Sequence, residues 1–209
     1  MCMTKDIVIV GYSGFAKEVE WLLKCANQVK KSYNLLGFID RTEGKDIVGN
    51  DQWICNYSKS LQVIVAIADC GIRNKLISLY KKNPNIIFPN VIDPSVRIGE
   101  LFEIGQGNII CANNVLTVGI KIGSFNIFNL NSTIGHGCII EDFITINPGC
   151  NISGDVRIKS GSFIGTGATI LQGKTIEEEA IIGAGAVVIN NVLPRSTNVG
   201  VPAKEVKIK

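Results

Sequence analysis

The chain of 209 residues is 46% hydrophobic, and its 21 Lys and Arg against 18 Asp and Glu give it a net charge of +3. A chain of this length and apolar content can form one ordinary domain or two small ones, which excludes a disordered protein. The charge is small and includes no run of five basic residues, so the sequence predicts no nucleic-acid partner.

The N-terminal residues also argue against secretion and membrane insertion. They carry one lysine and then a four-residue apolar run, which is too short for a signal-peptide core or a membrane span. No two of the seven cysteines are spaced as C-x-x-C, and a single histidine cannot complete a zinc site. We therefore expect reduced, mostly apolar cysteines in a cytoplasmic protein, and no metal. The cysteines are Cys2, Cys25, Cys55, Cys70, Cys111, Cys138 and Cys150.

The first part of the chain, residues 1–90, is predicted to form a small βαβ-type domain. Three apolar runs of strand length occur at Ile7–Val10, Leu35–Ile39 and Gln62–Ala68. Continuous apolar runs are typical of parallel strands buried on both faces. Apolar residues at helical spacing follow the first and third runs, at Phe15, Val19, Leu22, Leu23 and Ala26, and at Ile72, Leu76, Leu79 and Tyr80. The turn-forming stretch Ile86 to Pro94 is the predicted boundary.

A glycine-containing turn, Gly11 to Ala16, joins the first predicted strand to the first helix. Such a turn presents backbone N–H groups and the positive end of a helix to a phosphate. Asp40, at the end of the next strand, is well placed for a ribose or base contact. A purely structural strand-helix turn explains the G-x-x-G spacing about equally well, so both interpretations stay open.

The second part, residues 91–209, is dominated by a six-residue repeat. Every sixth residue from Ile92 to Val188 is apolar, seventeen positions in a row. At this composition the chance of such a run is roughly two in a million per starting frame, so the period is not accidental. A period of six fits neither an α-helix nor simple strand alternation, but it fits a parallel β-helix whose triangular coils contain three units each.

The residue four places after the repeat position is predicted to point into the coil as well. It is often small, so that large and small side chains share each layer. The positions concerned are Ser132, Cys138, Cys150, Ser162, Ala168, Ala180 and Ala186.

The repeat, the unit Ile134-Gly135-His136 and the closing segment Asn198 to Lys204 resemble the hexapeptide-repeat acyltransferases. That resemblance implies left-handed coils, a homotrimer, and acetyl-CoA lying in the groove between neighbouring subunits. Nearly the whole chain is similar to the PglD and NeuD group of bacterial sugar acyltransferases. The matching N-terminal segments are Gly11 to Val19, Gly37-Phe38-Ile39-Asp40, and Val65 to Asp69 with Arg73.

In the PglD and NeuD group the N-terminal domain binds a sugar nucleotide or a similar donor-linked sugar. The resemblance implies that role here for Gly11, Ser13, Gly14, Phe15, Ala16, Asp40, Arg41 and Ala68. Position 68 usually holds glycine in the group, so the approach to the nucleotide is expected to be tighter in this chain.

The catalytic histidine of the family falls on His136, the only histidine of the chain. An imidazole can serve as general base near neutral pH. The group commonly has Asp or Glu directly after this histidine, but this chain has Gly137. Glu141 and Asp142 are around the next corner, so we expect a backbone carbonyl or a neighbouring subunit to orient the ring.

The resemblance also implies contacts for both substrates. For CoA these are mainly backbone groups, at Ser153, Gly154, Gly165, Thr166, Gly183, Ala184 and Gly185. For the acceptor sugar, Thr145 stands where relatives have a second histidine, with Asn129 and Asn131 just upstream. Backbone hydrogen bonding at coil corners is an equally good explanation for the two asparagines.

We therefore expect an acetyl-CoA-dependent sugar acetyltransferase, with N-acetylation of a nucleotide-linked amino sugar for surface-glycan biosynthesis preferred. O-acetylation of sialic acid or another polysaccharide sugar stays open, as does a non-catalytic scaffold that binds a sugar nucleotide. A carbonic anhydrase on the same coil would need three histidines, and a dehydrogenase would need a larger dinucleotide domain.

Overall fold

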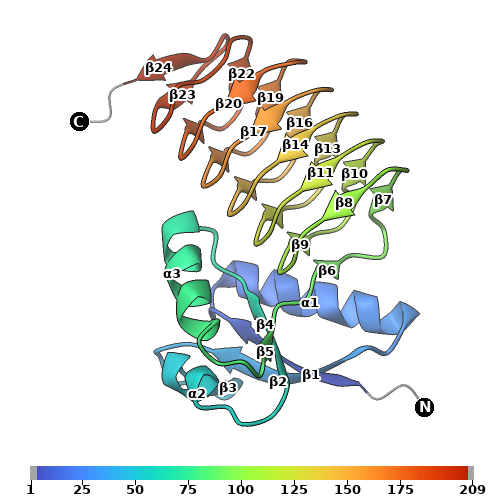
Figure 1. Ribbon diagram of the computed structural model, residues 1–209, viewed down its shortest axis with the longest axis vertical. Helices are drawn as coiled ribbons and strands as arrows, with labels where there is room; N and C mark the ends of the chain where they lie inside the picture. The colour runs from blue at the N-terminus through green and yellow to red at the C-terminus, as the bar shows by residue number, and fades with distance from the viewer. Residues whose placement is uncertain (1–3, 207–209) are drawn as a thin grey trace.

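The computed structural model describes residues 4–206, which form an α/β sheet followed by a stack of coils (Figure 1). The sheet contains five parallel strands in the order β3-β2-β1-β4-β5. Its elements are β1 (Lys5–Val10), α1 (Gly14–Val29), β2 (Tyr33–Ile39), β3 (Ile47–Gly49), α2 (Asp51–Cys55), β4 (Leu61–Val65), α3 (Cys70–Tyr80) and β5 (Ile86–Ile87).

The central strands are buried on both sides, as the continuous apolar runs predict. Ile7 and Ile9 of β1 pack with α1, whereas Val8 and Val10 pack on the opposite side with α3. The three predicted strands and both predicted helices are confirmed, although the third strand ends at Val65 rather than Ala68. No helix among the described residues is both long enough and apolar enough to span a membrane.

The coils consist of two-residue strands in three sheets, each pairing residue i with residue i+18, except at the last turn, where Ile181 pairs with Thr197 of a three-residue strand. The docking face comprises β6 (Val91–Ile92), β9 (Ile109–Ile110), β12 (Ile127–Phe128), β15 (Thr145–Ile146), β18 (Phe163–Ile164), β21 (Ile181–Ile182) and β23 (Thr197–Val199). β24 (Lys204–Val206) extends its sheet by antiparallel pairing with β23.

The other two faces differ in their outward side chains: those of the neutral face are uncharged from Val115 to Val187, whereas those of the charged face include Glu103, Lys121 and Arg157. The neutral face comprises β7 (Arg97–Ile98), β10 (Val115–Leu116), β13 (Thr133–Ile134), β16 (Asn151–Ile152), β19 (Thr169–Ile170) and β22 (Val187–Val188). The charged face comprises β8 (Glu103–Ile104), β11 (Lys121–Ile122), β14 (Ile139–Ile140), β17 (Arg157–Ile158) and β20 (Thr175–Ile176).

The six-residue repeat fills the interior of the coils, as predicted. From Ile110 to Val188 every repeat residue is buried, and the small residues predicted to share their layers are completely buried. The first three repeat residues are less buried because they lie in the terminal coil, which has no coil below it: Ile92 and Ile104 are partly buried, and Ile98 is exposed. Six of the cysteines are free thiols, and Cys2 lies outside the described residues.

The α/β part sits on the lower coils of the docking face. Residues of α1 share an apolar cluster with Val91, Ile109 and Ile127, the outward side chains of β6, β9 and β12. On the other side of the sheet, Phe125 packs in the cluster that contains α3. This arrangement determines which edge of the coil stack lies far from the α/β part.

Candidate active site

His136 lies at the corner where the chain turns from β13 on the neutral face to β14 on the charged face. Its side chain is 58% exposed, so the imidazole is open to a ligand. In a triangular stack this edge is opposite the docking face. The α/β part and the imidazole of one chain therefore occupy opposite sides of the coils.

A carboxylate from the coil above faces the imidazole. Asp155 Oδ1 lies 3.7 Å from His136 Nδ1, and Asp155 Oδ2 accepts a hydrogen bond of 3.1 Å from Gln172 Nε2 of the following coil. The backbone N–H of Asp155 donates to the carbonyl of His136 at 2.7 Å. Sequence reasoning missed Asp155, although the eighteen-residue coil places it directly above Gly137.

Glycines leave the room that this arrangement needs. A Cβ atom at Gly154 would lie 2.4 Å from His136 Nε2, so only glycine leaves the ring its present position. A Cβ atom at Gly137 would lie 2.4 Å from Asp155 Oδ1. The imidazole thus stands beside an unobstructed backbone segment, and the carboxylate fills the space above Gly137.

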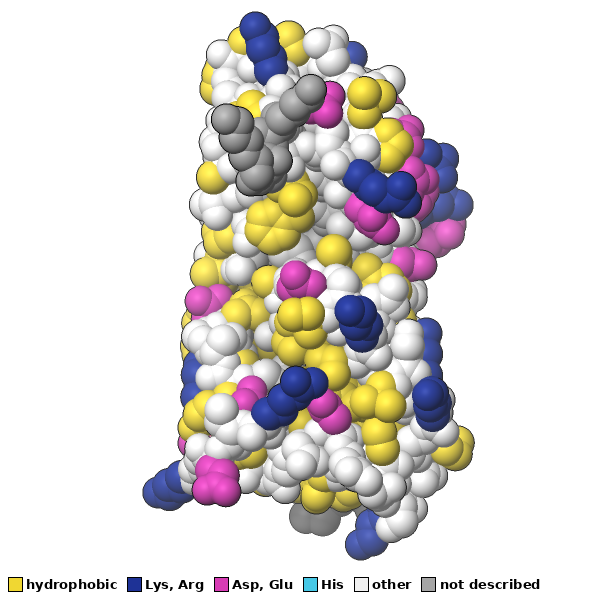
Figure 2. Space-filling view, turned by 90° about the vertical axis from the view of Figure 1, so that its left-hand side faces the viewer, with side chains coloured by type: hydrophobic (Ala, Val, Ile, Leu, Met, Phe, Trp, Pro, Cys, Tyr) yellow, Lys and Arg dark blue, Asp and Glu magenta, His cyan; other side chains and the backbone are white. Residues whose placement is uncertain are grey.

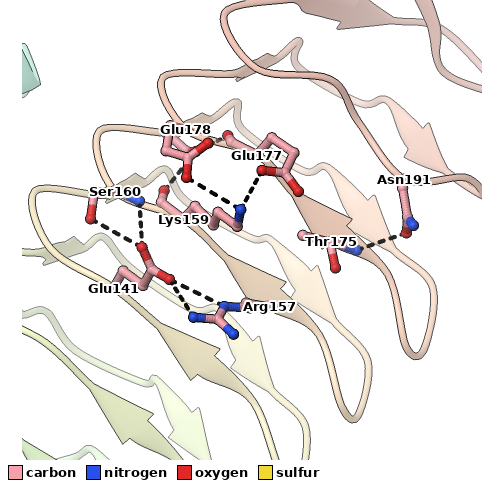
Figure 3. A network of polar contacts seen from close by, with 9 residues as sticks. Glu141, Arg157, Lys159, Ser160, Thr175, Glu177, Glu178 and Asn191 are labelled. Carbon is pink, nitrogen blue, oxygen red and sulfur yellow. Dashed lines mark hydrogen bonds and ion pairs between the residues drawn. The ribbon is translucent and has the colours of Figure 1, made fainter.

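The acidic residues that follow His136 in the chain are used elsewhere, as expected. Glu141 pairs with Arg157 at 2.8 Å and accepts from Ser160 (Figure 3). Asp142 accepts from the backbone N–H of Ser124.

The run Glu177-Glu178-Glu179, which begins at the corner after the charged face, forms ion pairs with basic side chains. Lys159 contacts both Glu177 and Glu178, which raises the pKa of its ammonium group chiefly through the hydrogen bond to Glu177 (Figure 3). Arg195 pairs with Glu179. These pairs make the charged face a polar surface.

The residues predicted to contact CoA fall into two groups on the two edges of the neutral face. Ser153 and Gly154 lie beside His136, one coil above it. Gly165, Thr166, Gly183, Ala184 and Gly185 lie on the edge between the docking and neutral faces. There Gly165 approaches Ala184 so closely that a Cβ atom would lie 2.6 Å from its backbone nitrogen.

A cavity of about 360 Å³ opens at the carboxyl ends of the parallel strands in the α/β part. Gly11, Asp40 and Arg41 line it, together with Asp51 and Ile67. Hydrogen bonds from Thr42, first from its backbone N–H, lower the pKa of Asp40, so its carboxylate is ionised. The strand ends of an open parallel sheet are where ligands bind in this class of fold.

The turn between β1 and α1 is partly available to a ligand. The side chain of Ser13, the N-cap of α1, makes no capping hydrogen bond, and Gly14 faces open space. Phe15 is half-buried, but Ala16 is completely buried against the sheet. A contact to Ala16 could therefore involve only its backbone.

The structure argues against Thr145 as an acceptor contact. Thr145 is 2% exposed, and its hydroxyl donates to the carbonyl of Ala68 and accepts from Arg73 Nη2. The carbonyl of Ala68 also accepts from Arg73 Nη1, so Thr145 and Ala68 both belong to the junction between the α/β part and the coils. Asn129 and Asn131 are at a corner, where the Asn129 side chain accepts from Leu130 N and Asn131 has a φ of 61°.

A second hollow, of about 550 Å³, lies between the start of α3 and the coils above the junction. Phe143, Phe163 and Ile181 contribute apolar lining. Figure 2, which views the side that carries α3, shows hydrophobic side chains gathered across this side of the molecule. An apolar surface of this kind is typical of a contact with another protein chain.

Comparisons with known proteins agree with this geometry. The family model described as PglD N-terminal domain matches residues 6–79, and no curated protein sequence matches the chain. Among solved structures, WeeI from Acinetobacter baumannii is 32% identical, with a TM-score of 0.86 over 97% of this chain and 100% of that one.

Two further structures were solved with ligands. The acetyltransferase domain of PglB from Neisseria gonorrhoeae, in complex with acetyl coenzyme A, is 26% identical, with a TM-score of 0.88 over 98% of this chain and 100% of that one. A perosamine N-acetyltransferase mutant from Caulobacter crescentus, in complex with CoA and GDP-perosamine, is 26% identical, with a TM-score of 0.88 over 97% of each chain.

The shared fold is a small α/β domain followed by a left-handed parallel β-helix. Identity above 30% over the full length of WeeI, together with the match of the N-terminal model, establishes the relationship. The chain belongs to the PglD-like family of bacterial sugar acetyltransferases.

Proposed function

We propose that this protein transfers the acetyl group of acetyl-CoA to the amine of a nucleotide-linked amino sugar. The observation that carries the proposal is the exposed imidazole of His136 beside Asp155, in a chain whose α/β part has a cavity at its strand ends. The relative solved with CoA and GDP-perosamine is named as an N-acetyltransferase. Residues 1–90 would hold the nucleotide, and residues 91–209 would hold CoA and perform the chemistry.

His136 would act as the general base. Its Nε2 takes a proton as the sugar nitrogen attacks the thioester carbon, and a backbone N–H near Gly154 donates to the developing oxyanion. When the C–S bond breaks, the imidazolium returns its proton to the departing thiolate, so the products are an amide and CoA. The nucleotide cavity and the coil edge supply orientation, which contributes about 7–11 kcal/mol at best.

The two edges of the neutral face would hold acetyl-CoA. From Val115 to Val187 the outward side chains of this face are uncharged, unlike those of the charged face. Ser153 and Gly154 on one edge stand beside His136, where the thioester must reach. Gly165, Thr166 and the segment from Gly183 to Gly185 would contact the remainder of CoA with backbone groups.

The active unit would be a homotrimer in the cytoplasm. The nucleotide cavity belongs to the α/β part, which packs on the docking face, whereas His136 lies on the opposite edge of the same coils. This placement supports a site in which a second copy supplies the histidine. The apolar hollow above the junction and the neutral face are surfaces that such copies could cover.

The test is release of CoA thiol from acetyl-CoA with nucleotide-linked amino sugars as acceptors. We expect turnover, and His136→Ala should lower it by about 10²–10⁴-fold with little change in CoA affinity. Glu103→Gln, on the charged face, is the control and should leave turnover unchanged. Turnover only with hydroxyl acceptors would redirect the proposal to O-acetylation, and sugar-nucleotide binding without turnover would indicate a scaffold.

A further inference from the structure

We propose that Asp155 is the positioning residue of His136, supplied by the coil above rather than by the residue that follows the histidine. The inference rests on the proposed function and assigns a new source for the acid of the catalytic pair. It starts from the distance of 3.7 Å between His136 Nδ1 and Asp155 Oδ1. Among residues 4–206, no other carboxylate forms an ion pair with this imidazole.

The position of the carboxylate is held from two directions. The backbone N–H of Asp155 donates to the His136 carbonyl at 2.7 Å, which fixes the vertical register of the two residues. Gln172 Nε2 donates to Asp155 Oδ2 at 3.1 Å and leaves Oδ1 directed toward the imidazole. Imidazole, carboxylate and amide thus form a column through three successive coils.

Gly137 stands where the group commonly has Asp or Glu, and its lack of a side chain makes room for this column of side chains. A Cβ atom there would lie 2.4 Å from Asp155 Oδ1, so a side chain at residue 137 and the present position of Asp155 compete for the same space. An acid directly after the histidine would displace the acid above it. The glycine at position 137 therefore accompanies a relocated carboxylate, and the imidazole keeps an acidic neighbour.

The contact can form a direct hydrogen bond during the reaction. Both side chains are more than half exposed and can rotate, and catalytic hydrogen bonds of unliganded enzymes often shorten when substrate binds. A carboxylate at Nδ1 keeps the proton on that nitrogen and leaves Nε2 free to accept one. Nε2 lies against the backbone of Gly154, where the absence of a side chain makes room for the ring.

The experiment moves the acid from one coil to the other. Asp155→Gly removes the carboxylate at a residue whose φ of 58° suits glycine, and the double variant Gly137→Asp with Asp155→Gly restores an acid below. Asp155 and Leu101 already occupy this corner position with positive φ, so aspartate can adopt the conformation at 137. Leu101→Gly is the matched control, because it removes a side chain from the same corner position two coils below Gly137.

Asp155→Gly should lower kcat by about 10–100-fold with little change in KM, which is less than the loss of a buried orienting acid causes. The double variant should recover most of kcat, and Leu101→Gly should retain it. A merely structural role of Asp155 would not be rescued by an acid at another residue. Full kcat in Asp155→Gly, or no recovery in the double variant, would overturn the inference.

A second readout does not depend on turnover. Because the chain has one histidine, the imidazole nitrogen signals in an NMR spectrum of tag-free protein belong to His136 alone. We expect a neutral ring protonated on Nδ1 in the unmodified protein, and a shift toward Nε2 protonation in Asp155→Gly. An unchanged tautomer would refute the role of Asp155 even if the protein acetylates no sugar, which separates this inference from the proposed function.

Discussion

Arg73 joins the two parts of the molecule through all of its guanidinium donors. Nε donates to Phe125 O, Nη1 to the carbonyls of Ile67 and Ala68, and Nη2 to Ile144 O and Thr145 Oγ1. The side chain is 1% exposed, and burial lowers its pKa to about 10. A buried cation is stable here because each of its N–H groups has a partner.

Replacing Arg73 by Met should destabilise the fold strongly. The apolar side chain would leave the carbonyl oxygens of Phe125 and Ile67 without donors, at about 1–3 kcal/mol for each orphaned group. The free energy of urea unfolding measures the effect. Arg195→Met, at an exposed ion pair, is the control and should change that energy by less than about 1 kcal/mol. Equal effects of the two substitutions would contradict the role assigned to Arg73.

At the scale of single residues, sequence patterns identify side chains by their neighbours along the chain. His136 and Asp40 stand out because motifs and strand ends mark them. Asp155 does not, since its partner is nineteen residues earlier and only the coil period connects them. Thr145 is the opposite case: its position suggests a functional role, because relatives have a histidine there, but its hydroxyl is hydrogen-bonded within the junction between the α/β part and the coils.

At the scale of elements, a ladder of buried asparagines bonds the backbones of successive lower coils to one another. Asn126 Oδ1 accepts from Ile144 N at 2.7 Å, and Asn126 Nδ2 donates to Glu141 O at 2.8 Å. Asn108, one coil below, accepts from Asn126 N in the same way. The equivalent positions in higher coils hold Ile144, Ser162 and Ala180, so the asparagine ladder is restricted to the coils on which the α/β part docks.

Asn126→Ala should therefore lower the free energy of unfolding by about 1–3 kcal/mol for each backbone group left unsatisfied. Chemical denaturation monitored by circular dichroism measures this loss. Asn151→Ala is the matched control, because Asn151 is exposed on the neutral face and its removal orphans no buried group. If both variants unfold at the same denaturant concentration, the ladder does not stabilise the coils.

The coils could be predicted in detail because the same inward apolar position recurs seventeen times at a strict spacing of six residues. The short elements of the α/β part could not. β3 and α2 contain three and five residues, too few to show periodicity, and β5 falls within the predicted boundary. The asparagine ladder also escaped the search for small inward residues, because asparagine reads as a corner residue until its buried partners are known.

At the scale of the whole molecule, the cavity and the histidine of one chain belong to two different active sites if copies assemble. Co-expression of His136→Ala with Arg41→Glu, whose reversed charge opposes a nucleotide phosphate, should restore turnover. Random mixing pairs an intact cavity with an intact histidine in about a quarter of sites. Thiol release by the purified mixed assembly measures the recovery. No recovery in assemblies shown to contain both variants would mean that each chain uses its own histidine.

The eighteen-residue register has a consequence for how the reach of this enzyme can change. The α/β part is docked at a set level of the stack, and the imidazole occupies a set level as well. The vertical offset between them can grow or shrink only by whole coils, in increments of about 4.8 Å. The stack thus sets the offset between nucleotide cavity and imidazole in fixed increments, and insertion or deletion of whole coils, rather than altered loops, would adapt the enzyme to longer or shorter acceptor sugars.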